Sequence, residues 1–273
     1  MEHVEAEEGH APPGRDALRR GGSQGGDRPQ RTRLQVAVVT GASSGIGAEL
    51  VRALQRRGTH VVGLSRRGSD ADEHESCDVT DREAVEAAAR RVLGRHPRID
   101  LLVCNAGVAA RADFLDAAPE RIEEVIRVNY LGSVWTTRAF LPALGEGSHV
   151  VNVVSVAGLW ATGPYSASKH AQLAFSRSLA VELAPRGVRV HTVNPGFVET
   201  PGFPQRGRFP RPLYRFVAQP PLVVERLLDA VDRDKREIVV PRWYRPAAWL
   251  QALVPGLVAS ASARTSRRLP RSP

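Results

Sequence analysis

A tyrosine and a lysine four positions apart, Tyr165 and Lys169, are the residues of this sequence whose types and spacing best suit acid–base chemistry. In a helix, residues i and i+4 share one face, so the phenol and the ammonium point the same way. A nearby cation favours the phenolate and lowers the pKa of tyrosine from about 10 toward the working pH. Ser155 ends the preceding predicted strand and is placed to hold a carbonyl oxygen near that phenol. These residues predict proton exchange with a substrate oxygen.

A glycine-rich turn separates the first predicted strand from the first predicted helix, with the sequence Thr40-Gly41-Ala42-Ser43-Ser44-Gly45-Ile46-Gly47. Glycines let the backbone approach a pyrophosphate closely, and a helix N-terminus offers free N–H groups and a positive dipole. The spacing is Gly-x-x-x-Gly-x-Gly rather than Gly-x-Gly-x-x-Gly. In this position the turn predicts a dinucleotide-binding loop; the alternative is a tight turn that binds nothing. The expected contacts are Gly41, Ser43, Ser44, Gly45, Ile46 and Gly47.

The end of the second predicted strand carries arginine where an NAD site usually carries an acid. The segment is Leu64-Ser65-Arg66-Arg67-Gly68, and the first carboxylate after it is Asp70. A carboxylate at this point would bind the ribose 2′-hydroxyl of NAD. Ser65 and Arg66 suit the 2′-phosphate of NADP instead, through charge-assisted hydrogen bonds. The sequence therefore favours NADP over NAD, unless these arginines are merely solvated.

Strands and helices alternate through the middle of the chain. The predicted strands are 34–40, 60–64, 99–104, 149–154, 188–193 and 237–240, and the predicted helices are 45–57, 80–95, 119–141 and 165–184. Thr80, three residues before Glu83, has the spacing of a capping box. The strands are continuous apolar runs, as expected when helices cover both faces of a parallel sheet. The predicted fold is α/β, a doubly wound parallel sheet of the Rossmann type in one domain with a C-terminal helical extension.

Composition divides the chain into three parts. Residues 1–33 have almost no large apolar side chain, which predicts a disordered N-terminal extension, or an upstream start codon that is not used. Residues 34–242 form the predicted dinucleotide-binding domain, in which the proline- and aromatic-rich segment 201–235 is expected to cover an apolar substrate. Residues 243–273 predict an amphipathic helix and a basic tail. The helix, 243–258, fits contact with a membrane surface, the substrate pocket or a partner subunit.

Charge and cysteine content exclude several classes of protein. The net charge is +9, but no basic stripe is interleaved with aromatic residues, so we expect no nucleic-acid binding and keep it only as an alternative. Cys77 and Cys104 have no metal-ligand or disulfide spacing and predict two reduced, buried thiols. No apolar run is long enough to span a membrane, and the N-terminus has no signal-like apolar segment. We expect a cytoplasmic protein.

Several motifs together resemble the short-chain dehydrogenase/reductase family over residues 34–200. In order they are Thr40–Gly47, Asn105-Ala106-Gly107, Asn129, Ser155, Tyr165-x-x-x-Lys169 and Pro195-Gly196. The resemblance implies an oxidoreductase that moves a hydride between nicotinamide and a carbonyl or alcohol. It implies that Tyr165 exchanges the proton and that Lys169 binds the nicotinamide ribose and depresses the tyrosine pKa. It further implies that Ser155 orients the substrate carbonyl.

The resemblance also implies roles for residues outside this trio. Asn129 would anchor a water in a proton relay, and Asn105 would steady the central strands beside the cofactor. Asp78 and Val79 would contact adenine, and Thr200 the nicotinamide amide. The other cofactor contacts expected from the family pattern are Ala106, Gly107, Pro195, Gly196 and Val198. Members of the family are usually dimers or tetramers, so a homo-oligomer is expected.

The sequence departs from the family pattern at two points. Cys104 replaces the first asparagine of the usual Asn-Asn-Ala-Gly, and only nine residues separate Ser155 from Tyr165, about three fewer than usual. The shorter segment puts the placement of the Ser155 hydroxyl in question more than that of Tyr165 and Lys169. The leading hypothesis is an NADP-dependent carbonyl reductase acting on an apolar ketone or aldehyde. The alternative is a scaffold or sensor that binds NADP(H) without turnover.

Overall fold

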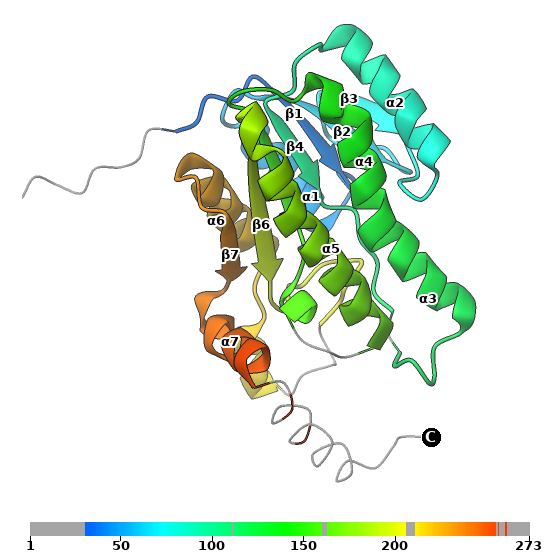
Figure 1. The fold of residues 1–273 in the computed structure, drawn as a ribbon, viewed down its shortest axis with the longest axis vertical. Helices are drawn as coiled ribbons and strands as arrows, with labels where there is room; N and C mark the ends of the chain where they lie inside the picture. Colours follow the sequence, from blue (N-terminus) through cyan, green and yellow to red (C-terminus); the bar gives the residue numbers. More distant parts are fainter. Residues whose placement is uncertain are drawn as a thin grey trace, which may run out of the picture. The chain divides into compact units, whose positions relative to one another are not determined.

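The centre of the molecule is a single parallel sheet. The computed structural model describes residues 31–110, 112–159, 163–205, 211–254, 256 and 260. Among these residues the sheet has seven strands in the order β3-β2-β1-β4-β5-β6-β7 (Figure 1). The strands are β1 (Val36–Thr40), β2 (His60–Ser65), β3 (Glu73–Ser76), β4 (Leu101–Cys104), β5 (His149–Val153), β6 (Arg189–Pro195) and β7 (Glu237–Val240). The order reverses between β1 and β4, which confirms the predicted doubly wound sheet and places a ligand crevice at their carboxyl ends.

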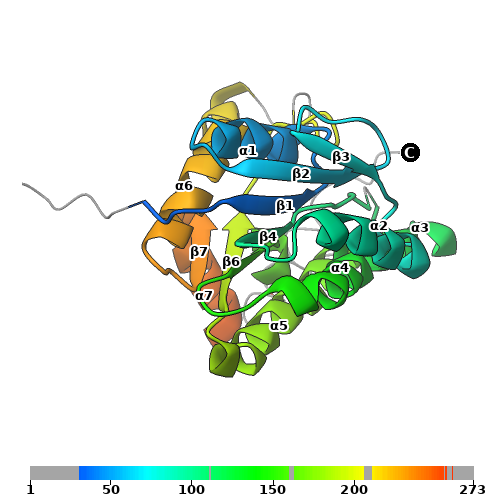
Figure 2. The ribbon, with the colours of Figure 1, turned by 90° about the horizontal axis from the view of Figure 1, so that it is seen from above.

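Helices cover both faces of this sheet (Figure 2). On one face, α1 (Gly45–Gln55) and α6 (Pro220–Asp232) share a buried apolar cluster with β1 and its neighbours. On the other face, a second cluster is built by α2 (Arg82–Arg95), α4 (Gly132–Phe140) and α5 (Gly163–Glu182). Burial of one Leu or Val side chain stabilises the fold by roughly 1.5–3 kcal/mol. Coverage of both faces explains why most strands are continuous apolar runs.

The structure contains two elements that were not predicted. β3 is an edge strand of mostly polar residues, Glu73–Ser76, with no apolar run to reveal it. α6 occupies most of the second half of segment 201–235, which was expected to cover the substrate, and its Val223 and Leu227 are fully buried in the core. Only the part of that segment before α6 is therefore left to face a substrate.

Two helix predictions differ in detail from the structure. The predicted helix 119–141 contains α3 (Pro119–Ile126) and α4, joined by a π-helical turn at Arg127–Leu131 and followed by a 3₁₀ turn at Leu141–Ala143. The capping-box prediction at Thr80 was wrong by one residue. Asp81 is the N-cap of α2 and accepts a hydrogen bond from the Ala84 N–H, while the Thr80 hydroxyl donates to Asp78.

The ends of the chain are described only in part. Residues 1–30 of the predicted N-terminal extension lie outside the described residues; within 31–33, the Thr32 N–H donates to Asp232 Oδ1 at 3.0 Å. At the other end a 3₁₀ turn, Arg242–Tyr244, leads into α7 (Arg245–Leu253), and most of the basic tail lies outside the described residues. No helix in the described part of the chain is long and apolar enough to cross a membrane.

The two cysteines are free and buried, which confirms that prediction. Burial raises the pKa of the Cys77 thiol to about 11, and nearby acids such as Asp78 add to the effect. Burial likewise raises the pKa of Cys104 to about 11, against the opposing effect of a hydrogen bond with Thr137. Both groups are therefore protonated at neutral pH and are poor nucleophiles.

A stacked pair of buried histidines lies between β5 and β6, with 5.1 Å between the ring centroids of His149 and His191. His149 Nδ1 is 2.8 Å from His191 Nε2, and His191 Nδ1 is 2.9 Å from the Lys235 carbonyl oxygen. A carbonyl oxygen only accepts, so we assign the His191 proton to Nδ1, and His191 Nε2 then accepts from His149. Burial lowers both pKa values, that of His149 to about 4. The folded pair is neutral.

This pair predicts a loss of stability in acid. Because the folded pKa values lie below the unfolded value of about 6.5, the unfolded chain binds protons that the folded chain excludes as the pH falls from about 6.5 toward 4. The free energy of unfolding should fall by up to roughly 1.4 kcal/mol per pH unit for each histidine. Urea unfolding of the wild type and of the His149→Leu/His191→Leu variant between pH 7 and 5 measures the difference in slope. The exposed His170→Gln is the control, and equal slopes in all three proteins would contradict the prediction.

Candidate active site

The glycine-rich loop connects β1 to α1 and leaves no room for side chains. Gly41 and Gly45 have φ angles of +67° and +58°, which other residues rarely adopt. A Cβ at Gly47 would lie 2.2 Å from the Gly41 carbonyl oxygen, so the backbone can approach this closely only with glycine there. Ser44 is the N-cap of α1 but makes no side-chain capping bond, and no acidic residue lies in the first turn. The loop and helix end fit a phosphate-bearing ligand.

Thr40 and Asn105 hold this loop in place at the carboxyl ends of β1 and β4. The Asn105 and Ala106 N–H groups donate to Thr40 Oγ1 at 2.9 and 3.1 Å. Asn105 Nδ2 donates to the Thr40 carbonyl oxygen at 3.0 Å. A Cβ on Gly107 would lie 3.3 Å from Asn129 Oδ1 and 3.7 Å from Lys169 Nζ, so Gly107 connects this corner to the acid–base residues. Thr40 was predicted only as the start of the loop, and its hydrogen bonds to the Asn105 and Ala106 N–H groups were not predicted.

The groups predicted to bind the adenosine half lie together at the end of β2. Arg66 NH1 is 3.8 Å from Asp78 Oδ2, and both side chains are well exposed, so this ion pair is weak and leaves the guanidinium accessible. Ser65 is buried, and its hydroxyl donates to the Arg67 carbonyl oxygen at 2.5 Å. Ser65 therefore shapes the turn, while the side chains of Arg66 and Arg67 are open to solvent. Val79 is buried and lies against Gly132.

Ser155, Tyr165 and Lys169 come together where β5 ends and α5 begins. The Ser155 side chain is hydrogen-bonded with Tyr165, and Lys169 Nζ lies 6.0 Å from the centroid of the Tyr165 ring. A short 3₁₀ helix, Val156–Leu159, follows Ser155, and residues 160–162 lie outside the described residues. Gly158 lies against the α5 backbone, since a Cβ there would be 2.8 Å from the Lys169 carbonyl oxygen. The shortened segment thus keeps Ser155 beside Tyr165.

The protonation of this trio differs from the expectation drawn from the sequence. Tyr165 is partly exposed, yet burial of its phenol raises the pKa to about 12, against the opposing effect of the hydrogen bond with Ser155. Burial lowers the pKa of the Lys169 ammonium to about 7. The predicted downward shift of the tyrosine pKa was therefore wrong for this structure, because desolvation of the phenol is the largest effect on it. At neutral pH Tyr165 carries its proton.

A chain of buried hydrogen bonds starts at Lys169 and was not predicted. Lys169 Nζ donates to the Val153 carbonyl oxygen at 3.1 Å and to Gln172 Oε1 at 2.8 Å. Gln172 Nε2 donates to Ser133 Oγ at 2.8 Å, and Ser133 Oγ donates to the Asn129 carbonyl oxygen at 3.2 Å. Gln172 and Ser133 are buried. Gln172, one helical turn after Lys169, could have been found as a polar residue on the apolar face of a helix.

Asn129 lies in the π-helical turn, and its side chain is fully engaged by protein groups. Asn129 Oδ1 accepts from the Val108 N–H at 2.8 Å, while Nδ2 donates to the Val108 carbonyl oxygen and to Ser168 Oγ at 3.0 and 2.9 Å. The side chain therefore positions the segment after β4 against α5. A water would have to be held by another group of this residue, such as the carbonyl oxygen.

The remaining predicted residues follow β6. A Cβ at Gly45 would lie 3.1 Å from Thr200 Cγ2, and the Ser155 hydroxyl donates to the Pro195 carbonyl oxygen at 3.4 Å. Gly196 is covered by the Tyr244 ring, 2.2 Å from where a Cβ would be. Two other predicted cofactor contacts lie toward the core. Val198 is buried in the apolar cluster shared by α1 and α6, and Ile46 packs against that cluster. The Phe203 ring lies 5.6 Å from the Tyr165 ring and gives the site an apolar wall.

Comparison with known proteins identifies the family. The family model for short chain dehydrogenases matches residues 35–209, which include the glycine loop, Ser155, Tyr165 and Lys169. The chain belongs to the short-chain dehydrogenase/reductase family. This chain is 33% identical over 189 residues to a Drosophila melanogaster protein named dehydrogenase/reductase SDR family protein 7-like, a match that covers 61% of this chain and 58% of that protein.

Two further relatives extend the comparison. A Streptomyces virginiae protein named as a ketoacyl reductase of the monensin polyketide synthase is 38% identical over 189 residues, covering 61% of this chain and 72% of its own length. A solved structure of a Burkholderia cenocepacia short chain dehydrogenase in complex with NADP is 30% identical, with a TM-score of 0.74, and covers 85% of this chain and 98% of that one. The oxidoreductase family and the Rossmann-type fold predicted from the sequence are thereby confirmed.

The contact between Gln172 and Lys169 predicts opposite effects for two substitutions in this dehydrogenase. Gln172→Leu removes an acceptor from the ammonium, so the pKa of Lys169 should fall below about 7; Gln172→Glu adds a negative charge, so it should rise. The limb of the pH–rate profile that follows Lys169 should shift to lower pH in the first variant and to higher pH in the second. Profiles that move in the same direction, or not at all, would show that Gln172 only fills space.

Proposed function

We propose that this dehydrogenase is an NADP(H)-dependent carbonyl reductase acting on an apolar ketone or aldehyde. The observation that carries the proposal is the protonated Tyr165, hydrogen-bonded with Ser155 and lying beside the buried Lys169 at the carboxyl end of β5. A phenol that keeps its proton at neutral pH is ready to give it to an oxygen that gains negative charge. A protonated Tyr165 can act as the general acid when a carbonyl is reduced.

The residues around the crevice fit a dinucleotide. The glycine loop leaves a surface that a Cβ would fill, and the start of α1 offers N–H groups without a competing acid. Gly107 lies directly against Lys169, where a larger residue would crowd the ammonium. Gly41, Ser44 and Gly45 would hold the pyrophosphate, and Lys169 the ribose next to the nicotinamide. The bound nicotinamide supplies or accepts a hydride at the substrate carbon.

The chain's own residues then handle the substrate oxygen. Ser155 and Tyr165 both present hydroxyl groups, so the oxygen can accept two hydrogen bonds, which favours the alkoxide character that develops during reduction. Tyr165 donates its proton to that oxygen and becomes a phenolate. Lys169, supported by the Val153 and Gln172 oxygens, stabilises the phenolate as an ammonium. Ser133 and the Asn129 carbonyl oxygen continue this chain of hydrogen bonds and hold Gln172 in place beside the ammonium.

The preference for NADP rests on Arg66. Arg66 is an exposed cation at the end of β2, where an acid would favour NAD, and its guanidinium lies 3.8 Å from the Asp78 carboxylate. The Burkholderia cenocepacia relative was solved with NADP, which agrees with this assignment.

The apolar character of the substrate and the assembly of the protein are supported by surface features. Phe203 lies beside Tyr165, and the exposed Phe216 and Trp243 rings pack at 6.1 Å between their centroids.

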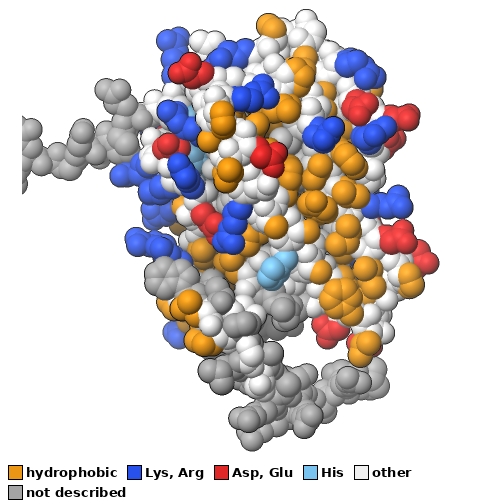
Figure 3. All heavy atoms as spheres, viewed as in Figure 1, with side chains coloured by type: hydrophobic (Ala, Val, Ile, Leu, Met, Phe, Trp, Pro, Cys, Tyr) orange, Lys and Arg blue, Asp and Glu red, His pale blue; other side chains and the backbone are white. Residues whose placement is uncertain are grey.

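Figure 3 shows a band of hydrophobic side chains over α4 and α5. We propose that this band pairs with a second copy in a homo-oligomer. Contact of 243–258 with a membrane surface stays a proposal that rests on exposed Trp243, Leu250 and Leu253.

Replacement of Tyr165 by phenylalanine tests the catalytic proposal. NADPH-dependent turnover of a panel of apolar ketones and aldehydes should fall by roughly 10²–10⁴-fold, because the general acid is lost. NADPH affinity, followed by fluorescence titration, should stay close to that of the wild type. Retained turnover would contradict the role of Tyr165, and NADPH binding without turnover in the wild-type protein would favour the scaffold or sensor.

Replacement of Arg66 by alanine tests the cofactor preference. The Kd for NADPH should rise by about 10–100-fold, the value of a charged hydrogen bond to the 2′-phosphate, while the Kd for NADH changes little. Arg90→Ala is the matched control. It removes an exposed arginine of α2 and should leave both dissociation constants unchanged. An equal loss for NADPH and NADH in the Arg66 variant would show that Arg66 does not recognise the 2′-phosphate.

A further inference from the structure

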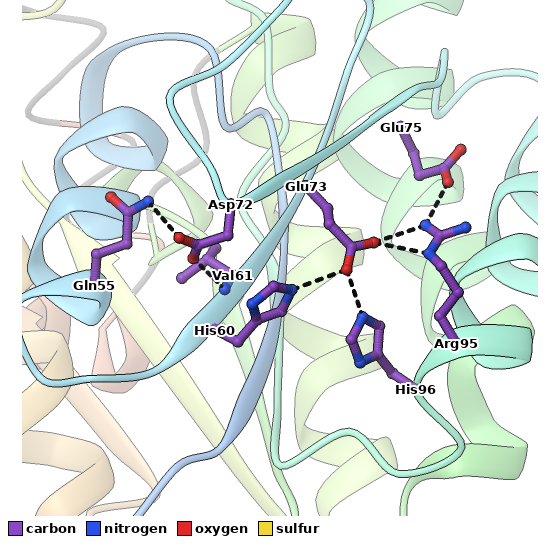
Figure 4. Close-up of polar contacts among 8 residues, drawn as sticks. All are labelled: Gln55, His60, Val61, Asp72, Glu73, Glu75, Arg95 and His96. Atoms are coloured by element: carbon purple, nitrogen blue, oxygen red, sulfur yellow. Dashed lines mark hydrogen bonds and ion pairs between the residues drawn. The ribbon is translucent and has the colours of Figure 1, made fainter.

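Two imidazoles and one carboxylate meet at the amino-terminal edge of the sheet, opposite the end that carries Tyr165. His60 is the first residue of β2, Glu73 is the first residue of β3, and His96 is the C-cap of α2. β2 and β3 are paired in parallel, so both begin at this edge. Figure 4 shows the three side chains pointing toward one another from these separate elements.

The three side chains are now joined by hydrogen bonds, and their possible ligand atoms lie close to the spacing of a coordination sphere. Glu73 Oε1 lies 2.9 Å from His60 Nε2 and 2.7 Å from His96 Nε2. The three possible ligand atoms all lie within 4.8 Å of one another, and the two rings are tilted by 40° with centroids 5.0 Å apart. A tetrahedral zinc site with bonds of about 2.0–2.1 Å spaces its ligands about 3.3 Å apart. Small movements of partly exposed rings would bring all three atoms to that spacing.

The surrounding residues orient the carboxylate for a single metal bond. Arg95 Nε donates to Glu73 Oε2 at 2.8 Å, which leaves Oε1 directed at the two histidines (Figure 4). Arg95 NH2 also donates to Glu75 Oε1 at 2.7 Å, and Arg91 donates to the other Glu75 oxygen at 2.8 Å. Such outer hydrogen bonds fix the geometry of metal ligands. The two arginines and the two glutamates balance in charge, so they do not repel a divalent cation.

We propose that His60, Glu73 and His96 form a binding site for a divalent transition-metal ion, with zinc as the best fit. Two neutral imidazoles and one carboxylate are the donor set that zinc accepts, and the partly exposed side chains leave a fourth position for water. The ion would link β2, β3 and the end of α2 at an edge of the sheet distant from the proposed carbonyl chemistry. Its role is structural, and it is independent of the proposed function.

The cluster is also an ion-pair network in its own right, and this is the competing interpretation. Burial raises the pKa of Glu73, but hydrogen bonds with His96, His60 and Arg95 outweigh it and lower the pKa to about 2. Glu73 is therefore charged at neutral pH with or without an ion. The two interpretations differ in what they require of the histidines. A metal site needs both imidazoles at once, whereas the ion pair between Glu73 and Arg95 needs neither.

Isothermal titration of ZnCl₂ into the EDTA-treated and dialysed full-length chain tests the site. The wild type should bind one zinc ion per chain with high affinity, and His60→Gln and His96→Gln should each weaken binding by at least about 100-fold. His170→Gln, which removes an exposed histidine on α5, is the matched control and should bind like the wild type. Zinc should raise the melting midpoint of the wild type and the control but not of the two cluster variants.

A second measurement keeps the test decisive if the variants fold poorly. Co²⁺ added to the wild type should give the strong visible absorption of a tetrahedral site rather than the weak spectrum of the aqueous ion. Absence of that absorption, lack of one-to-one zinc binding by the wild type, or equal zinc binding by His60→Gln, His96→Gln and wild type would each overturn the proposal. In those cases the cluster is the ion-pair network alone.

Discussion

The arrangement of the active site depends on the burial of one ammonium group. Lys169 is almost fully enclosed, and a buried cation must find acceptors or lose its proton. The fold supplies the Val153 carbonyl oxygen from the end of β5 and Gln172 from the next turn of α5. Gln172 Nε2 in turn donates a hydrogen bond to Ser133 Oγ, and Ser133 Oγ donates one to the Asn129 carbonyl oxygen in the π-helical turn. Four elements, β5, α5, α4 and the π-helical turn, are thus connected through the groups that solvate a single charge.

The need to give buried polar groups hydrogen-bond partners also applies to the sheet, which is not uniformly apolar. β5 and β6 contain buried polar side chains, and each is paired across the sheet or with α5: Asn152 Nδ2 donates to Ser176 Oγ at 3.0 Å, and Ser176 Oγ lies 2.7 Å from Thr192 Oγ1. His149 Nδ1 is hydrogen-bonded with His191 Nε2, and His191 Nδ1 with the Lys235 carbonyl oxygen, while His149 Nε2 is buried without a hydrogen-bond partner in the described part of the chain. Buried polar groups are tolerated where partners are provided, and such contacts specify the register of neighbouring strands.

The sequence was sufficient where the information is local. The glycine loop, the turn of helix from Tyr165 to Lys169 and the apolar strands follow from spacing and composition, so the fold and the outline of the site could be predicted. β3 could not, because an edge strand of four mostly polar residues has no apolar pattern. The pKa of Tyr165 could not either: the spacing identifies a nearby cation, but the shift depends on how deeply both groups are buried, which only tertiary packing decides.

Residues that meet only through strand register are the hardest to recognise from a sequence. His60 and Glu73 are thirteen positions apart and His96 follows after another twenty-three, a spacing that matches no local metal-binding pattern. They come together because β2 and β3 begin at one edge of the sheet and α2 returns the chain to it. The candidate active site, with its proposed carbonyl chemistry, lies at the opposite, carboxyl end of the strands. A doubly wound sheet thus has two edges with separate chemistry, and residues on the amino-terminal edge can change without disturbing Tyr165 and Lys169.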